Sequence, residues 1–153
     1  MTEARNVTVC VLLVDNDRIL LIKNPEEIKT IPGKKPFKKE SKWGMPRGRK
    51  EPEDKDDIAT CDREGREETG YEIEVDSRYR VQESVDDHNM IAFVGYPVAG
   101  RLEPDPKEII EARWFSPRVL WAESGDKDHL DMHPRQRRMA QALWRNFKNG
   151  GRR

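Results

Sequence analysis

The first long apolar run, NVTVCVLLVD at 6–15, is almost continuous and rich in β-branched side chains. Such a run is typical of a strand that is buried on both faces of a sheet. The residues Asp15, Asn16 and Asp17 favour a turn, and RILLIK at 18–23 is apolar again. We therefore expect two early strands that are joined as a hairpin.

Two further strands are predicted in the middle of the chain. The stretch 72–83 alternates in part between polar and apolar residues, and 90–98 (MIAFVGYPV) is richer in apolar ones. Polar residues at 86–89 separate the two stretches. Pro97 has no backbone N–H, so the end of the second strand is expected at an edge of the sheet.

The C-terminal third shows helical patterns. Residues 134–148 have the period of an amphipathic helix, with apolar side chains at every fourth position from Met139. A shorter helix is expected from Ser116 to Trp121, because serine is a favoured N-cap and Pro117 then occupies the first helical position.

One more helix is expected around 63–70 (REGREETG). Gly70 is expected to end it, because glycine adopts the left-handed C-cap conformation at little cost. Asp56 or Asp57 is expected to cap its N-terminus.

This helix carries an acidic face. Glu64, Glu67 and Glu68 are three and four residues apart, so their carboxylates lie on one side of the helix. Like charges at this spacing reduce stability unless a cation lies between them. Oxygen ligands suit a hard cation, so the pattern predicts a site for Mg²⁺, with Mn²⁺ as the alternative.

Charge is distributed unevenly along the chain. The 153 residues include 29 basic and 29 acidic side chains, so the formal net charge is zero. Residues 29–50 nevertheless contain seven lysines and two arginines against one glutamate, whereas residues 51–68 contain nine carboxylates against three basic residues. A basic segment beside an acidic metal site fits a polyphosphate substrate.

The segment 24–42 contains six lysines and three prolines and has no usable periodicity. It is either a solvated surface loop or a basic lid over the metal site. In the lid interpretation Phe37 or Trp43 would stack on a base. The same interpretation assigns substrate phosphates to four lysines, namely Lys34, Lys35, Lys38 and Lys39.

The stretch from 43 to 71, WGMPRGRKEPEDKDDIATCDREGREETGY, resembles the signature of the Nudix hydrolases. That signature is G-x5-E-x7-R-E-U-x-E-E-x-G-U, in which U is a bulky apolar residue. The matching residues are Gly48, Arg63, Glu64, Glu67, Glu68, Gly70 and Tyr71. The resemblance implies an α/β fold, a Nudix-type α/β/α sandwich with a mixed central sheet, formed by one domain over residues 1–153 with a basic loop at 24–42.

The match departs from the signature in two places. Gly48 and Arg63 are 15 residues apart, one more than the signature allows. The isolated glutamate of the motif is therefore Glu53 or Asp54, and we favour Glu53. Arg63 is expected to be a structural partner of Glu53 or Asp54. Gly65 replaces a bulky residue, so either a large neighbour fills the gap or the helix lies closer to the sheet.

A further feature of the family lies at 107–115 (KEIIEARWF), where a glutamate precedes the tryptophan of the last core strand by six residues. That glutamate is Glu108. The resemblance implies that it is a further metal ligand or the general base; the alternative is an ordinary solvated side chain.

The resemblance also implies a chemistry. It predicts metal-dependent hydrolysis of a phosphoanhydride bond in a nucleoside diphosphate-linked substrate, with the metal held by Glu64, Glu67 and Glu68. Glu67, Glu68 and Glu108 are the predicted catalytic residues, and Arg47 is expected to bind substrate phosphates. Dinucleoside or nucleoside polyphosphates rank first as substrates, and RNA 5′ ends that carry a cap or triphosphate rank second.

A non-catalytic nucleotide-binding module with the same fold is the rival hypothesis, but retention of the three motif glutamates favours activity. Cys10 and Cys61 are expected to be reduced and buried, because the sequence has no paired Cys motif or Cys/His metal spacing. No apolar run approaches 18 residues, so we expect a cytoplasmic protein that does not bind membranes.

Overall fold

A seven-stranded mixed sheet forms the centre of the molecule. The computed structural model describes residues 6–30, 32–85 and 87–150. Five strands follow one another in the order β5-β2-β1-β8-β7, while β6 also pairs with β1 and β9 with β2. Their bounds are β1 Asn6–Asp15, β2 Arg18–Lys23, β5 Trp43–Gly44, β6 Arg47–Arg49, β7 Tyr71–Val85, β8 His88–Gly100 and β9 Glu111–Phe115.

The pairing makes the sheet mixed. β1 runs parallel to β8, with Asn6 opposite His88, and the other pairs are antiparallel. The predicted hairpin of β1 and β2 turns at Asn16 and Asp17, whose φ angles are 50° and 58°. Positive φ at both central residues matches the twist of the flanking strands, and Asn and Asp tolerate it.

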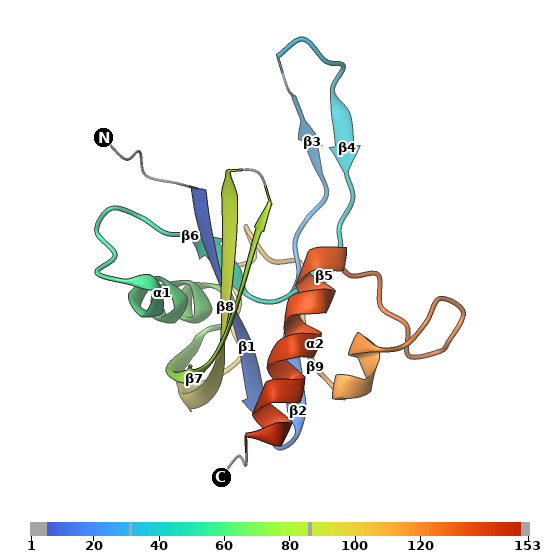
Figure 1. The fold of residues 1–153 in the computed structure, drawn as a ribbon. Helices are drawn as coiled ribbons and strands as arrows, with labels where there is room; N and C mark the ends of the chain where they lie inside the picture. The colour runs from blue at the N-terminus through green and yellow to red at the C-terminus, as the bar shows by residue number, and fades with distance from the viewer. Residues whose placement is uncertain (1–5, 31, 86, 151–153) are drawn as a thin grey trace.

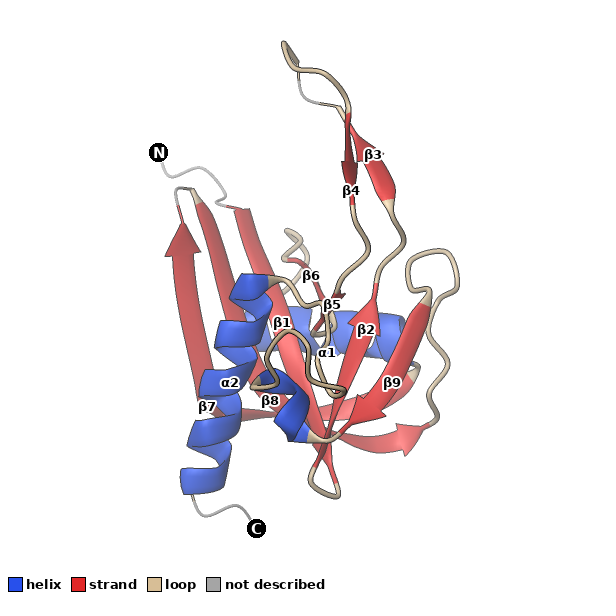
Figure 2. Ribbon diagram, turned by 90° about the vertical axis from the view of Figure 1, so that its right-hand side faces the viewer, coloured by secondary structure: helices blue, strands red, loops and turns tan. Residues whose placement is uncertain are grey.

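Two helices cover opposite faces of this sheet. α1 spans Asp57–Thr69 and α2 spans Pro134–Asn149, and the short 3₁₀ helix η1 spans Pro117–Leu120. Figure 1 shows the sheet between the two helices, and Figure 2 shows α2 in front of the sheet and α1 behind it. The predicted α/β/α sandwich is therefore confirmed.

β1 shows why its apolar run is continuous. Successive side chains of a strand point to opposite faces. Val9, Val11 and Leu13 join the apolar cluster that includes Cys61 of α1, while the residues between them join the cluster that includes Leu143 of α2. Both faces are covered, so both sets of side chains have to be apolar.

Residue identities at its two ends fix the limits of α1. Asp56 is the N-cap, and its Oδ1 accepts the Ala59 N–H at 2.8 Å. Gly70 ends the helix with φ 87°, and a Cβ there would lie 2.6 Å from the carbonyl oxygen of Arg101. Any other residue at this position would combine left-handed strain with a backbone clash.

The expectation of an irregular segment at 24–42 was wrong. β3 (Glu27–Lys29) and β4 (Phe37–Lys39) form a second, two-stranded sheet. This β3–β4 hairpin projects from the body of the molecule in both ribbon views (Figure 1, Figure 2). Each strand has only three residues, and Ile28, Phe37 and Lys38 are exposed, so the hairpin leaves no apolar alternation for sequence analysis to detect.

Cys10 and Cys61 are free and buried, as expected. The Cys61 thiol lies 3.7 Å from the carbonyl oxygen of Cys10. Burial raises the pKa of Cys10 to about 11 and raises the pKa of Cys61 further. Among the described residues, no helix is long and apolar enough to cross a membrane.

These two thiols are expected to be inert in the native protein. A thiol reacts as its thiolate, so in an Ellman assay at about pH 8 we expect no rapid reaction before unfolding. Both thiols should react once denaturant is added. Rapid modification of either one in native buffer would contradict the burial described above.

Candidate active site

The first contact of the site joins β6 to α1. The backbone N–H of Arg47 donates a hydrogen bond to Oε1 of Glu68 at 2.9 Å. Glu68 is only 6% exposed. Burial raises the pKa of its carboxyl to about 8, while the hydrogen bond from Arg47 and the Arg47 guanidinium oppose this rise. A buried carboxyl group is costly to ionise unless a positive charge lies close to it.

Gly48 faces Glu64, another acidic side chain of α1. A Cβ built on Gly48 would lie 2.0 Å from the carboxyl carbon of Glu64, far inside contact distance. Glycine is therefore the residue that lets β6 approach the helix so closely. Burial raises the pKa of Glu64, and the neighbouring Arg63 guanidinium opposes that rise.

Arg63 connects the loop before α1 to the acidic face. Its Nε and one NH2 group donate to the two carboxylate oxygens of Asp54, at 3.1 and 2.7 Å. Its other guanidinium nitrogen donates to Oε1 of Glu64 at 2.9 Å. The guanidinium of Arg63 also holds the pKa of Asp54 well below its ordinary value. The two parallel hydrogen bonds to Asp54 fix the orientation of the Arg63 guanidinium and its distance from the carboxylate.

A cavity of about 490 Å³ opens beside these groups. Arg47, Arg49 and Glu68 line it, together with Glu108 from the segment before β9. Asn24 holds this wall in place, because its Nδ2 donates to the carbonyl oxygen of Glu108 and its Oδ1 accepts from Arg47, both at 3.1 Å. The cavity therefore combines carboxylates with arginines, which suits a cation and a phosphate together.

A sequence model of the NUDIX domain matches residues 4–141, which is most of the chain. The chain belongs to the Nudix family. Nudix hydrolases cleave pyrophosphate bonds in nucleoside diphosphate derivatives and generally need divalent metal ions. The chain is accordingly a Nudix pyrophosphohydrolase.

Solved structures of other proteins share this fold. A Nudix hydrolase from Nitrosomonas europaea is 23% identical with a TM-score of 0.64, over 97% of this chain and 92% of that one. A MutT protein from Methanosarcina mazei is 22% identical with a TM-score of 0.63, over 94% and 95%. An ADP-ribose pyrophosphatase from Streptococcus suis is 13% identical with a TM-score of 0.61, over 97% and 93%. Among curated protein sequences, none matches the chain.

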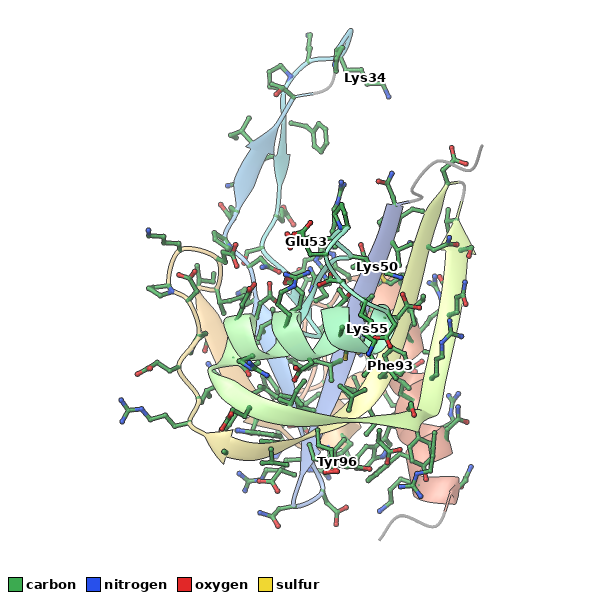
Figure 3. The ribbon with its side chains drawn as sticks, turned by 90° about the vertical axis from the view of Figure 1, so that its left-hand side faces the viewer. Lys34, Lys50, Glu53, Lys55, Phe93 and Tyr96 are labelled. Carbon is green, nitrogen blue, oxygen red and sulfur yellow. The ribbon has the colours of Figure 1, made fainter. Side chains whose placement is uncertain are left out.

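Of the two residues expected to pair with Arg63, the structure pairs Asp54, and not Glu53, which we favoured as the isolated glutamate of the motif. Glu53 is exposed on the loop that precedes α1 (Figure 3). Asp54 also accepts hydrogen bonds from the Glu51 N–H at 2.8 Å and the Thr60 hydroxyl at 2.9 Å. Its distance from Gly48, six residues, is the one the signature specifies, so spacing alone could have identified it. The extra residue lies between Asp54 and Arg63.

Asp54→Asn is expected to lower kcat about 10- to 100-fold, as is usual for partners that orient metal ligands. The substitution removes the negative charge of the carboxylate to which Arg63 donates two hydrogen bonds, so Arg63 would position Glu64 less firmly. Glu53→Gln is the matched control, because it removes the same charge one residue away. Equal rates for the two variants in steady-state assays would show that the contact between Arg63 and Asp54 does not affect kcat.

Glu67 is the most exposed of the three motif glutamates and lies 3.7 Å from Arg63. Within the described part of the chain, no three acidic, histidine or cysteine side chains converge closely enough to hold a metal ion. The donor set nevertheless fits a hard cation, because all three side chains offer carboxylate oxygens from one helix. The raised pKa values of Glu64 and Glu68 also mean that a nearby cation would favour their charged forms.

The structure does not bring the predicted lysines to the cavity. Lys34, Lys35 and Lys38 are exposed on the hairpin and are not among the residues that line the cavity, while the side chain of Lys39 is outside the described part. Lys42 and Lys107 line it instead. The predicted stacking role of Trp43 was also wrong. Its side chain is 6% exposed and packs edge-on against Phe115, with ring centroids 5.0 Å apart.

Sequence analysis missed Gln136, a buried side chain of α2. Its Oε1 accepts the Met45 N–H at 3.0 Å, and the Met45 carbonyl oxygen accepts from the Arg47 guanidinium at 2.9 Å. Gln136 thereby connects α2 to the segment that positions Arg47 against Glu68. A polar residue on the buried face of an amphipathic helix was the available signal.

Proposed function

We propose that this Nudix protein hydrolyses a phosphoanhydride bond of a nucleoside or dinucleoside polyphosphate, using Mg²⁺ or Mn²⁺. Glu64, Glu67 and Glu68 would hold the cation. The observation that carries the proposal is the position of Glu68, a buried carboxylate at the wall of a cavity that Arg47 and Arg49 also line. Groups for a cation and for phosphates thus meet in one place.

The side chains divide the work between binding and proton transfer. When bound, a divalent cation offsets charge on phosphate oxygens and makes a water more acidic. Arg47 and Arg49 would bind phosphates that are not attacked, and Glu108 would accept a proton from the attacking water. The water oxygen forms the new P–O bond, the bridging P–O bond breaks, and its electron pair stays on the leaving phosphate.

RNA 5′ ends are the second candidate substrate. Asn24 and Lys42, at the two ends of the segment that forms the β3–β4 hairpin, both line the cavity. A chain attached to a nucleotide in the cavity would therefore leave it beside this hairpin. We place the reaction in the cytoplasm, where both substrate classes occur.

A hydrolysis screen tests the proposal. The substrates are nucleoside triphosphates, diadenosine polyphosphates, ADP-ribose and 5′-triphosphate RNA, each with Mg²⁺, Mn²⁺ or EDTA, and ion-exchange chromatography identifies the products. We expect metal-dependent turnover that is fastest with a polyphosphate. If none of these substrates is turned over with either metal, the proposal that the protein hydrolyses nucleoside or dinucleoside polyphosphates is wrong.

A further inference from the structure

The β3–β4 hairpin exposes large apolar side chains on both faces. Lys29 is opposite Phe37 and Ile28 is opposite Lys38, so Phe37 and Ile28 lie on different faces. Ile28 is 67% exposed and Phe37 46%. A two-stranded hairpin without a partner is only marginally stable in water, so a partner that covers Phe37 or Ile28 would stabilise it.

The same hairpin is strongly basic. From Glu27 to Lys39 the hairpin has five lysines against one acidic residue, Glu27 itself. Lys34 and Lys35 are exposed in the connection between the strands, and Figure 3 shows Lys34 near the tip. The Lys38 ammonium lies 3.0 Å from Glu26 at the base of the hairpin. A partner of this surface is therefore expected to be anionic.

We propose that the β3–β4 hairpin is a binding arm for a single-stranded polynucleotide. Lys34, Lys35 and Lys38 would contact phosphates, and Phe37, on the face opposite Lys38, would stack on an unpaired base, the combination that single-strand binders use. A second copy of this chain fits less well, because pairing of two hairpins would bring like charges together. The arm begins at the cavity wall, so a bound strand would pass beside the cavity.

Binding is measured without hydrolysis, so this proposal stands or falls separately from the proposed activity. The probe is a fluorescein-labelled single-stranded RNA of about 12 nucleotides, within the usual site sizes. Fluorescence anisotropy is recorded in EDTA for the wild type and for the K34E/K35E/K38E variant. We expect the Kd to rise at least about tenfold for the variant at about 50 mM salt.

The salt dependence measures the phosphate contacts. Loss of three lysine contacts should reduce the slope of log Kd against log salt by about 2. Single-stranded DNA of the same sequence should bind within about threefold of RNA, because phosphates and base faces are common to both. A duplex should bind more weakly, since its bases are not free to stack.

Phe37→Ala separates stacking from charge. It should weaken single-strand binding at least about fivefold and leave the salt slope unchanged, because no charge is lost. Unchanged affinity, or equal affinity of the wild type for duplex and single strands, would overturn the stacking part and with it the assignment to single strands.

The control variant R101E/R118E/K127E reverses three exposed charges on other surfaces. It should bind as the wild type does, and circular dichroism should show that all variants are folded. Several results would overturn the proposal: no binding of RNA or DNA by the wild type, an equal loss in the control variant, or equal competition by a poly-glutamate peptide. A dimer in light scattering that the arm variant dissociates would assign the arm to a second copy instead.

Discussion

Glu68→Gln is expected to lower kcat by at least about a hundredfold, on the order of removing one key electrostatic stabiliser. The change removes the negative charge that would hold a cation, but it keeps the side-chain volume and an oxygen to accept the Arg47 N–H. The measurement is kcat at saturating Mg²⁺ with the best substrate of the screen. A rate near that of the wild type would disprove the metal assignment.

One control accompanies this variant. Glu72→Gln makes the same chemical change at an exposed position of β7 and should leave kcat unchanged. The pKa of Glu68 is raised from 4.5 to about 8 in the metal-free protein, so ionisation destabilises the fold. The wild type should therefore lose stability as pH rises from about 4.5 towards 8 through this group, and Glu68→Gln should lack that loss.

Gly48→Ala is expected to reduce kcat about 10- to 100-fold, as for changes that displace a metal ligand from its position. It should also raise the Mg²⁺ concentration that gives half of the maximal rate. The added Cβ would overlap the Glu64 carboxyl group, so Glu64 would have to move away from β6. Kinetic titration with Mg²⁺ measures both effects.

A double-mutant cycle shows whether Gly48 acts through Glu64. In a Glu64→Ala background the colliding carboxylate is gone, so Gly48→Ala should add little further loss. If the two substitutions instead reduce kcat independently, Gly48 is required for another reason, such as the course of β6 itself.

Much of the fold could be predicted because burial leaves periodic signals. The bounds of β1 and β2 match the predicted 6–15 and 18–23, and α2 differs from 134–148 by one residue. The β3–β4 hairpin left no such signal, because its strands pair with each other and do not pack into the core. A pattern of apolar residues does not reveal strands that pair with each other but are not buried.

The residue types of the site could be predicted from the sequence, but the contacts between those residues could not. Spacing put three glutamates on one helix face, yet only the structure distinguishes the buried Glu68 from the exposed Glu67. The same holds for Gly65, where sequence left two options. A Cβ there would lie 2.6 Å from Cδ1 of Ile73, so this large neighbour fills the space that the missing side chain leaves.

The contact between Gln136 and Met45 has a consequence for the order of assembly on the ribosome. The chain is synthesised from its N-terminus, so the whole motif at 43–71 is made well before α2. Until α2 packs on the sheet, the Met45 N–H lacks the Gln136 acceptor and the segment that positions Arg47 is held from one side only. The nascent chain thus carries every motif residue before it can form the finished cavity.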